Sequence, residues 1–180
     1  VDAGDIDGDG DVDFVVANGA VSDIPNDIYI NDGSGNFTRR AFLFVAGSTA
    51  EVSDNSWAIR LADIDNDGDL DVFTGNFGFG PVQSYYYLND GAGNFYYTSR
   101  VDLGAAAIAV SMATGDFNGD GWVDVALGHL GQSAYGTSNR VSVYFNNGSG
   151  AYGSPLVFSA SDVPYALEAG DIDGDGDLDL

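Results

Sequence analysis

The stretch DIDGDGDVD, from Asp5 to Asp13, decides the fold because it recurs three more times along the chain. The other copies are DIDNDGDLD (Asp63–Asp71), DFNGDGWVD (Asp116–Asp124) and DIDGDGDLD (Asp171–Asp179). We call the four segments loops one to four. Their starts at residues 5, 63, 116 and 171 are 58, 53 and 55 residues apart. A motif that returns at a nearly constant interval indicates an array of structural repeats.

A second motif keeps the same phase as the acidic one. It reads IYINDGSGNF up to Phe37, YYYLNDGAGNF up to Phe95 and VYFNNGSGAY up to Tyr152. Each copy has a short alternating stretch, a turn rich in Asn and Gly, and then an aromatic residue. Asn and Gly accept the positive φ angles of tight turns, so each copy predicts a β-hairpin around what we call an Asn-Gly turn.

Each period therefore has room for four strands, and no long stretch has a helical period. The strands expected in the successive repeats are, before the acidic loop, Trp57–Ala62, Val110–Thr114 and Tyr165–Ala169; after it, Val12–Ala17, Leu70–Thr74 and Val123–Leu127; before the Asn-Gly turn, Ile28–Ile30, Tyr85–Leu88 and Val141–Phe145; and after it, Thr38–Phe44, Tyr96–Leu103 and Leu156–Ser159. Four strands in about 55 residues is the size of a β-propeller blade. We expect an all-β fold with about three four-stranded blades and a partial fourth, in a single array over residues 1–180.

The net charge of the chain disfavours some classes of binding partner. Twenty-eight acidic residues face five Arg and no Lys, which gives a formal net charge of −23. Such a charge argues against nucleic acid and against anionic membrane surfaces as partners. The sequence contains no Cys, so it has no disulfide or thiolate site, and no apolar run approaches the ~20 residues that span a bilayer.

The acidic loops follow the pattern D-x-[DN]-x-D-G-x-x-D, which suits a hard cation. Side-chain oxygens at positions 1, 3, 5 and 9 and the carbonyl at position 7 can surround one ion, while Gly at position 6 permits the sharp turn. Several flexible carboxylates without His or Cys favour Ca²⁺ over Mg²⁺. The expected side-chain ligands are Asp5, Asp7, Asp9, Asp13, Asp63, Asp65, Asp67, Asp71, Asp116, Asn118, Asp120, Asp124, Asp171, Asp173, Asp175 and Asp179, and the expected carbonyl ligands belong to Asp11, Asp69, Trp122 and Asp177.

The sequence thus predicts up to four Ca²⁺ ions. We expect loop three to bind most weakly, because Asn118 and Trp122 stand where the other loops carry Asp. Acidic turns without metal are the alternative, which the mutual repulsion of four or five carboxylates disfavours. An EF-hand requires Glu at position 12, where this chain has Val16, Thr74 and Leu127.

The segment GDIDGDGDVDFVVANG followed by IYINDGSGNF resembles the FG-GAP/VCBS-type repeat of integrin α-subunit propellers and many bacterial secreted proteins. The segment nearest to the motif that names the family is GNFGFGP, at Gly75–Pro81. The resemblance covers essentially the whole chain. It implies a β-propeller with Ca²⁺ in the hairpin loop between the first and second strands of each blade, in a protein outside the cell or on its surface.

The longer connectors, on the face away from the acidic loops, are the expected place for a protein or glycan ligand. They are Asn18–Asn26, Ala46–Ser56, Gly75–Ser84, Gly128–Asn139 and Ser159–Pro164. Aromatic residues there, Phe77, Phe79 and Tyr135, can stack on sugars, but we favour packing between blades for them, and for Tyr85–Tyr87. His129, the only His, reads as structural.

We expect a calcium-stabilised scaffold for adhesion, recognition or assembly rather than an enzyme. The acidic residues outside the loops that could serve catalysis form no recognisable pair; they are Asp23, Glu51, Asp54, Asp162 and Glu168. The alternatives are a lectin, a polysaccharide-degrading propeller, or a subunit that stacks into a filament. Stacking is suggested because Val1–Phe14 has the same phase as Leu167–Leu180, so incomplete end blades could associate.

Overall fold

A computed structural model of the chain describes residues 1–19, 24–44, 55–78, 82–104, 107–131 and 138–180. The described chain is all-β, with three four-stranded antiparallel sheets and, as its helical content, one 3₁₀ turn at Tyr97–Ser99. The predicted fold class, all-β with propeller-like blades, is confirmed. The prediction of a single array over the whole chain stays a prediction.

Each sheet is a meander in which strands pair in chain order. The first sheet comprises β1 (Asp2–Gly4), β2 (Asp13–Val16), β3 (Asp27–Asn31) and β4 (Phe37–Ala41). The second comprises β6 (Ser56–Ala62), β7 (Asp71–Asn76), β8 (Tyr85–Tyr87) and β10 (Val101–Asp102). The third comprises β11 (Ile108–Gly115), β12 (Asp124–Leu130), β13 (Arg140–Tyr144) and β14 (Leu156–Ser159). We call them blades one, two and three.

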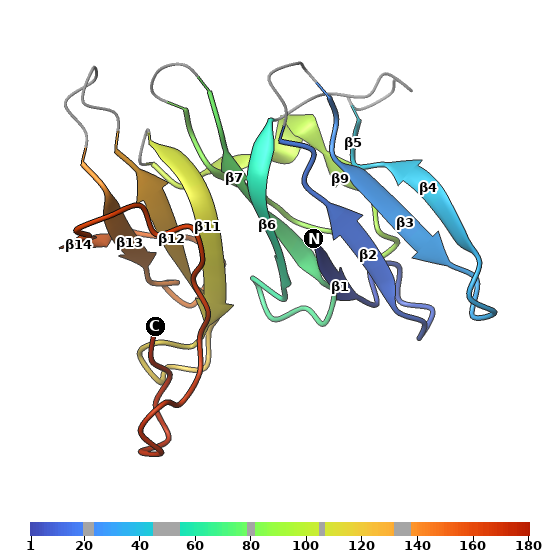
Figure 1. The fold of residues 1–180 in the computed structure, drawn as a ribbon. Helices are drawn as coiled ribbons and strands as arrows, with labels where there is room; N and C mark the ends of the chain where they lie inside the picture. Colours follow the sequence, from blue (N-terminus) through green and yellow to red (C-terminus); the bar gives the residue numbers. More distant parts are fainter. Residues whose placement is uncertain (20–23, 45–54, 79–81, 105–106, 132–137) are drawn as a thin grey trace.

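The blades stand side by side, and their acidic loops lie at the same end of the molecule (Figure 1). The first strand of blade two, β6, contacts the first strands of both neighbours, β1 and β11. Blades one and two are also joined by a short parallel pair, β5 (Leu43–Phe44) with β9 (Phe95–Tyr96). This arrangement brings loop one next to blade two and loop two next to blade three.

Two hydrophobic clusters fill the spaces between the blades, and the tyrosines of β8 contribute to both. Tyr87 packs toward blade one, with its ring centroid 5.4 Å from that of Phe42. Tyr86 packs toward blade three, 5.5 Å from the ring of Tyr152. Successive side chains of a strand point to opposite faces, so one strand supplies aromatic residues to both interfaces. The expected inter-blade role of Tyr85–Tyr87 is confirmed for these two residues.

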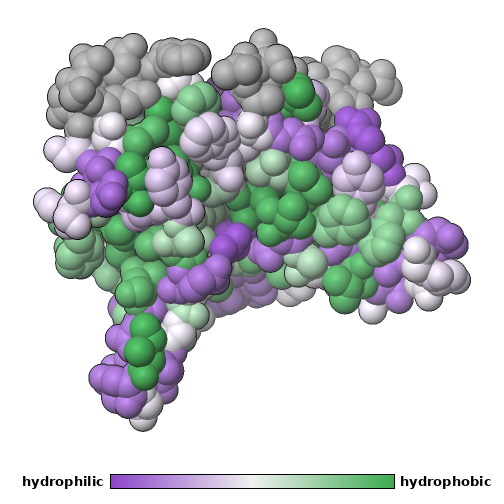
Figure 2. Space-filling view, viewed as in Figure 1, coloured by the Kyte–Doolittle hydropathy of each residue, from purple (hydrophilic) through white to green (hydrophobic). Residues whose placement is uncertain are grey.

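The structure departs from the expected strands in the fourth repeat and at the blade edges. Tyr165–Ala169 forms no strand, because its expected partner across loop four is reduced to one bridge between Gly170 and Asp179. Loop four projects from the body (Figure 1), carries both apolar and polar side chains (Figure 2), and leaves Ile172 78% exposed. The fourth strands of blades one and two are broken into short pieces.

Candidate metal loops

The Asp at position 1 shapes each loop by accepting hydrogen bonds from the loop backbone. In loop one, Oδ1 of Asp5 accepts from the N–H of Gly8 (2.9 Å) and Asp9 (3.1 Å), and Oδ2 accepts from Gly10 N–H (3.0 Å). The equivalent Asp residues of the other loops, Asp63, Asp116 and Asp171, accept in the same way. The four loops therefore share one backbone conformation, set by a carboxylate that faces inward.

The fourth position of each loop needs a left-handed backbone conformation. Gly8, Gly119 and Gly174 occupy it with φ of 77°, 72° and 81°. In loop two the residue is Asn66, with φ of 58°. Asn is among the few non-glycine residues that tolerate this region, which is why the motif admits Asn here without losing the loop.

The Asp at position 9 ties its loop to the Asn-Gly turn of the same blade. Oδ2 of Asp13 accepts from Ile6 N–H (2.9 Å), and Oδ1 accepts from Asn31 N–H (2.8 Å). Asp71 and Asp124 repeat both bonds in blades two and three, and the three carboxylates are at most 1% exposed. In loop four, Asp179 accepts from Ile172 N–H (3.0 Å). The same side chain thus orders the loop and closes the hairpin, in blades one to three.

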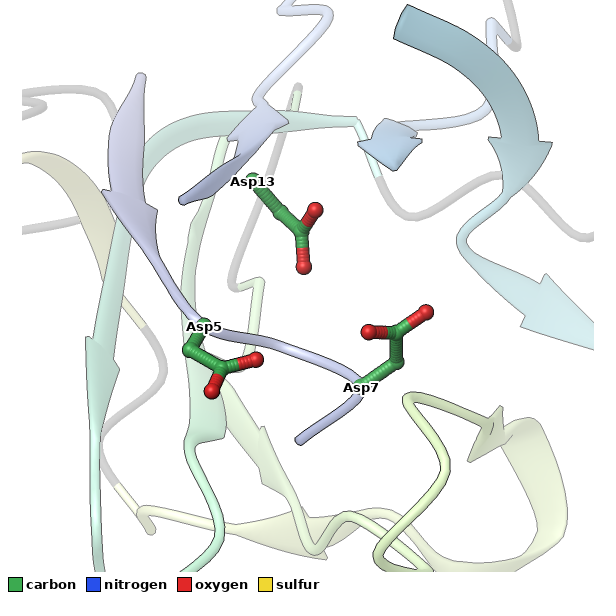
Figure 3. A group of neighbouring side chains, drawn as sticks. All are labelled: Asp5, Asp7 and Asp13. Carbon is green, nitrogen blue, oxygen red and sulfur yellow. The ribbon is translucent and has the colours of Figure 1, made fainter. Parts of the chain in front are cut away.

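The carboxylates at positions 1, 3 and 9 converge on a common space (Figure 3). Oxygens of Asp5, Asp7 and Asp13 lie within 4.8 Å of one another. The corresponding groups in loops two and four consist of Asp63, Asp65 and Asp71, and of Asp171, Asp173 and Asp179. Loop three has Asn118 at position 3, so its set holds two carboxylates and one amide. Hard oxygen donors gathered in this way fit a Ca²⁺ ion.

The side chains at position 5, which are also expected ligands, turn back toward the loop backbone. Asp9 accepts from Asp11 N–H (3.0 Å), and Asp67, Asp120 and Asp175 accept from the N–H of position 7 in their loops. The side chain at position 7 lies against the Asn-Gly turn: a Cβ built on Gly33 would collide with Asp11 Oδ2, and one on Gly148 would meet Trp122 Nε1 at 3.3 Å. With that side chain turned aside in loops one to three, the backbone carbonyls of Asp11, Asp69 and Trp122 remain as predicted ligands, and that of Asp177 in loop four stays a prediction.

Buried and closely spaced carboxylates dominate the electrostatics of loops one to three, although in loop one the charge of Arg40 opposes the rise in the pKa of Asp7. Burial, and then the neighbouring carboxylates, raise the pKa of Asp7 and Asp65. Burial raises the pKa of Asp71 to about 7 against two backbone hydrogen bonds that lower it, and it raises the pKa of Asp124. Oδ1 of Asp7 and of Asp65 are buried without a hydrogen-bond partner. A cation among these oxygens would satisfy them and favour the charged carboxylates.

Three meander sheets, each with an acidic hairpin loop between its first two strands, define a β-propeller-type repeat protein. A family model described as FG-GAP-like repeat matches residues 5–74, 77–127 and 133–180. The chain therefore belongs to the FG-GAP-like repeat family.

Among solved structures the chain is similar to a lectin of Agrocybe aegerita, described by its recognition of non-reducing terminal N-acetylglucosamine. The TM-score is 0.52 at 21% sequence identity, and the match covers 88% of this chain and 37% of the lectin. The chain thus spans well under half of that lectin, and the likeness concerns the fold. No curated protein matches the sequence. Within the described residues, no helix combines the length and the apolar character that crossing a membrane requires.

The other residues singled out in the sequence serve packing or lie outside the described residues. Phe77 stacks on Trp57 at 4.2 Å within blade two. His129 lies in β12 rather than in a connector and is fully buried, because that strand extends to Leu130. Glu168 lies 3.5 Å from Arg60. Asp23, Glu51, Asp54, Phe79 and Tyr135 are outside the described residues.

The sequence reasoning missed the asparagines that begin the turns. Asn31, Asn89 and Asn146 stand at the same position in the three copies of the second motif, which was the signal available. Oδ1 of each accepts from one or two glycine N–H groups of its own turn. The side-chain amides of Asn89 and Asn146 also reach the neighbouring blade, as described below.

Proposed function

We propose that this chain is a calcium-stabilised propeller segment that acts outside the cell as a scaffold for adhesion, recognition or assembly. The observation that carries the proposal is the convergence of buried carboxylate oxygens in loops one and two, where Oδ1 of Asp7 and of Asp65 have no partner. Extracellular calcium is far more abundant than resting cytosolic calcium, so sites of modest affinity would be filled only outside the cell.

In this proposal the side chains at positions 1, 3 and 9 hold the ion, joined by the carbonyl at position 7. The ion would supply neutralising charge to a loop whose carboxylates are desolvated and close together. Position 9 would transmit that effect to the sheet, because its carboxylate also fixes the start of the second strand and the Asn-Gly turn. The role of the metal is structural, and we retain the prediction that the chain is not an enzyme.

The test is the number of calcium ions bound by the folded chain. Equilibrium dialysis with ⁴⁵Ca²⁺ should give up to four ions per chain, and excess Mg²⁺ should displace few of them because Mg²⁺ requires a tighter octahedral site. Asp5→Asn and Asp63→Asn together should reduce the number by two. A chain that remains folded and binds no calcium at millimolar concentration would refute the proposal.

A second candidate function, glycan binding, is supported by a pocket between blades two and three. An open hollow of about 310 Å³ lies between Asp102–Gly104 on one side and Tyr152–Pro155 on the other. A carboxylate, a hydroxyl and an aromatic edge are groups that bind sugars, and the similar lectin recognises a terminal N-acetylglucosamine. Titration with N-acetylglucosamine, followed by the amide signals of Gly104 and Gly153, should show saturable shifts that Asp102→Ala removes. Absence of shifts at high sugar concentration would leave the scaffold role alone.

Self-association remains a proposal, supported by an apolar surface on the outer side of blade three. Val141, Phe158, Leu167 and Leu180 line a hollow of about 320 Å³, and Phe158 is 55% exposed. A further blade or a second copy would cover such a surface. Multi-angle light scattering in calcium should then show a concentration-dependent increase in mass that Phe158→Ser abolishes; a constant monomer mass would contradict it.

A further inference from the structure

The Asn-Gly turns of blades two and three lie on the acidic loops of blades one and two. Nδ2 of Asn89, in blade two, donates to the carbonyl of Ile6 in loop one (2.9 Å). Nδ2 of Asn146, in blade three, donates to the carbonyl of Ile64 in loop two (2.9 Å). Ile6 and Ile64 are both position 2, between the converging Asp residues at positions 1 and 3. The same contact therefore occurs at both blade interfaces.

The turns also cover the position 3 carboxylates of the preceding loops. A Cβ built on Gly93 would lie 3.2 Å from Cβ of Asp7, and one built on Gly150 would lie 3.2 Å from Cβ of Asp65. Glycine allows this approach, since φ is +70° and +72° at the two positions. The close cover explains why Oδ1 of Asp7 and of Asp65 are buried, although both loops are at the surface of their own blades.

Each of these asparagines also contacts its own loop, so one side chain joins two loops. Nδ2 of Asn89 donates to Leu70 O (3.0 Å), and its backbone N–H donates to Asp71 Oδ1 (2.8 Å). A chain of contacts thus runs from position 2 of loop one through Asn89 to position 9 of loop two. Asn146 makes the equivalent contacts with Val123 O and Asp124 Oδ1 in blade three.

Resting on the proposed calcium role, we propose that the Asn-Gly turn of each following blade completes the metal loop before it, with Asn89 and Asn146 as positioning residues for loops one and two. The donated hydrogen bond fixes the peptide at position 2, between the Asp ligands at positions 1 and 3. The glycine of the turn excludes water from the carboxylate at position 3. Calcium binding in one loop orders the shared Asn, and the second loop then needs less ordering to bind. Calcium in one loop therefore favours calcium in the other. Loops three and four have no such cover among the described residues.

The proposal makes a site-resolved expectation that NMR can measure. The N–H of the position 6 glycines, Gly10, Gly68, Gly121 and Gly176, donates to the position 1 carboxylate and so reports the loops separately. In the wild-type chain, Gly10 and Gly68 should respond at lower calcium than Gly121 and Gly176. One hydrogen bond contributes about 0.5–1.5 kcal/mol, so Asn89→Ala should weaken loop one by about two- to tenfold.

Asn31 provides the matched control. Its side-chain amide donates to Val12 O of its own loop (3.2 Å) and, among the described residues, has no contact with another blade. Asn89→Ala should change the titration of Gly10 and Gly68 directly and leave Gly121 with only the smaller effect passed through loop two. Asn146→Ala should change Gly68 and Gly121 and leave Gly10 with only the smaller effect passed through loop two. Asn31→Ala should act directly on Gly10 and pass only a smaller effect to Gly68.

The outcomes separate this proposal from the calcium role itself. If Asn89→Ala alters Gly68 but leaves Gly10 at its wild-type midpoint, the turns serve only their own blades and the proposal is wrong. If no glycine signal of the wild-type chain responds to calcium, the proposed calcium role itself is wrong. Asn89→Ser, which keeps an acceptor for the turn, repeats the test where the alanine variant does not fold; an unchanged Gly10 midpoint there also overturns the proposal.

Discussion

Removal of calcium should destabilise this fold through loops one to three and leave loop four without effect on global unfolding. The difference follows from position 9. Asp13, Asp71 and Asp124 are buried acceptors that tie loop, strand and turn together, so these loops are lost when the sheets unfold. Loop four is closed at its base by a single bridge between Gly170 and Asp179, and its residues are largely exposed, so it opens locally.

The magnitude follows from linkage. Each loop that is occupied at a hundredfold excess of calcium over its Kd stabilises the folded chain by about 2.7 kcal/mol. Three loops give about 8 kcal/mol, which is comparable with the whole stability of an ordinary domain of ~5–15 kcal/mol. For a chain of this size about 1 kcal/mol shifts Tm by about 2–4 °C, so EGTA should lower Tm by about 15–30 °C.

Calorimetry or circular dichroism in calcium and in EGTA measures this shift, and two substitutions at position 9 locate it. Asp71→Asn should reduce the calcium-dependent part of Tm by about 5–10 °C, because one loop no longer contributes. Asp179→Asn, the same change in loop four, should leave it unaltered. The reasoning is refuted if calcium shifts Tm by less than about 3 °C, or if the two variants lose equal parts of the shift.

Three further predictions concern single residues. Burial and the charge of Arg140 lower the pKa of His129 to about 4, so neutral His129 stabilises the fold above pH 6.5, and this stabilisation is lost at lower pH as the unfolded chain takes up a proton. In urea unfolding, the free energy of unfolding of the wild type should fall by about 1 kcal/mol more than that of His129→Gln between pH 7 and 5.5. Tb³⁺ in loop three should luminesce on excitation of Trp122, and Trp122→Phe should remove most of that emission; equal emission from the variant would place the ion elsewhere. Tyr87→Ala, which empties a fully buried site, should cost about 3–5 kcal/mol, while Trp57→Ala, at a residue 41% exposed, should cost less than half of that by the same urea assay.

Much of the fold was predictable from the sequence because two short motifs recur in phase. The acidic loop and the Asn-Gly turn each demand a hairpin, and their alternation fixes four strands per blade in chain order. Strand ends at the loops were close: the expected Trp57–Ala62 is observed as Ser56–Ala62. The local signals failed where a strand depends on a neighbour. Tyr165–Ala169 has the pattern of a strand, but without paired strands beside it the segment stays irregular.

The site was predictable in its composition and only partly in its arrangement. Spacing alone identifies the acidic positions, but it does not separate Asp13, which accepts two backbone hydrogen bonds, from Asp9, which turns back to the loop. That distinction arises from where the Asn-Gly turn meets the loop, which is a tertiary contact. Asn89 was overlooked for the same reason, since its side chain donates to Ile6, which is more than 80 residues earlier in the sequence and belongs to another blade.

The acidic loop of one repeat and the Asn-Gly turn of the next repeat together form one structural unit. An acidic loop alone is a surface hairpin with excess negative charge, as the exposed loop four shows. Beside the next blade, the same nine residues gain an amide donor on position 2 and a glycine against position 3. Blade packing therefore buries the carboxylates, and a cation bound among these desolvated groups would stabilise the packed state. Since blades two and three cover the loops of their predecessors, the proposed metal binding and the packing of blades would stabilise one another, which is a physical reason for both motifs to recur with the same period.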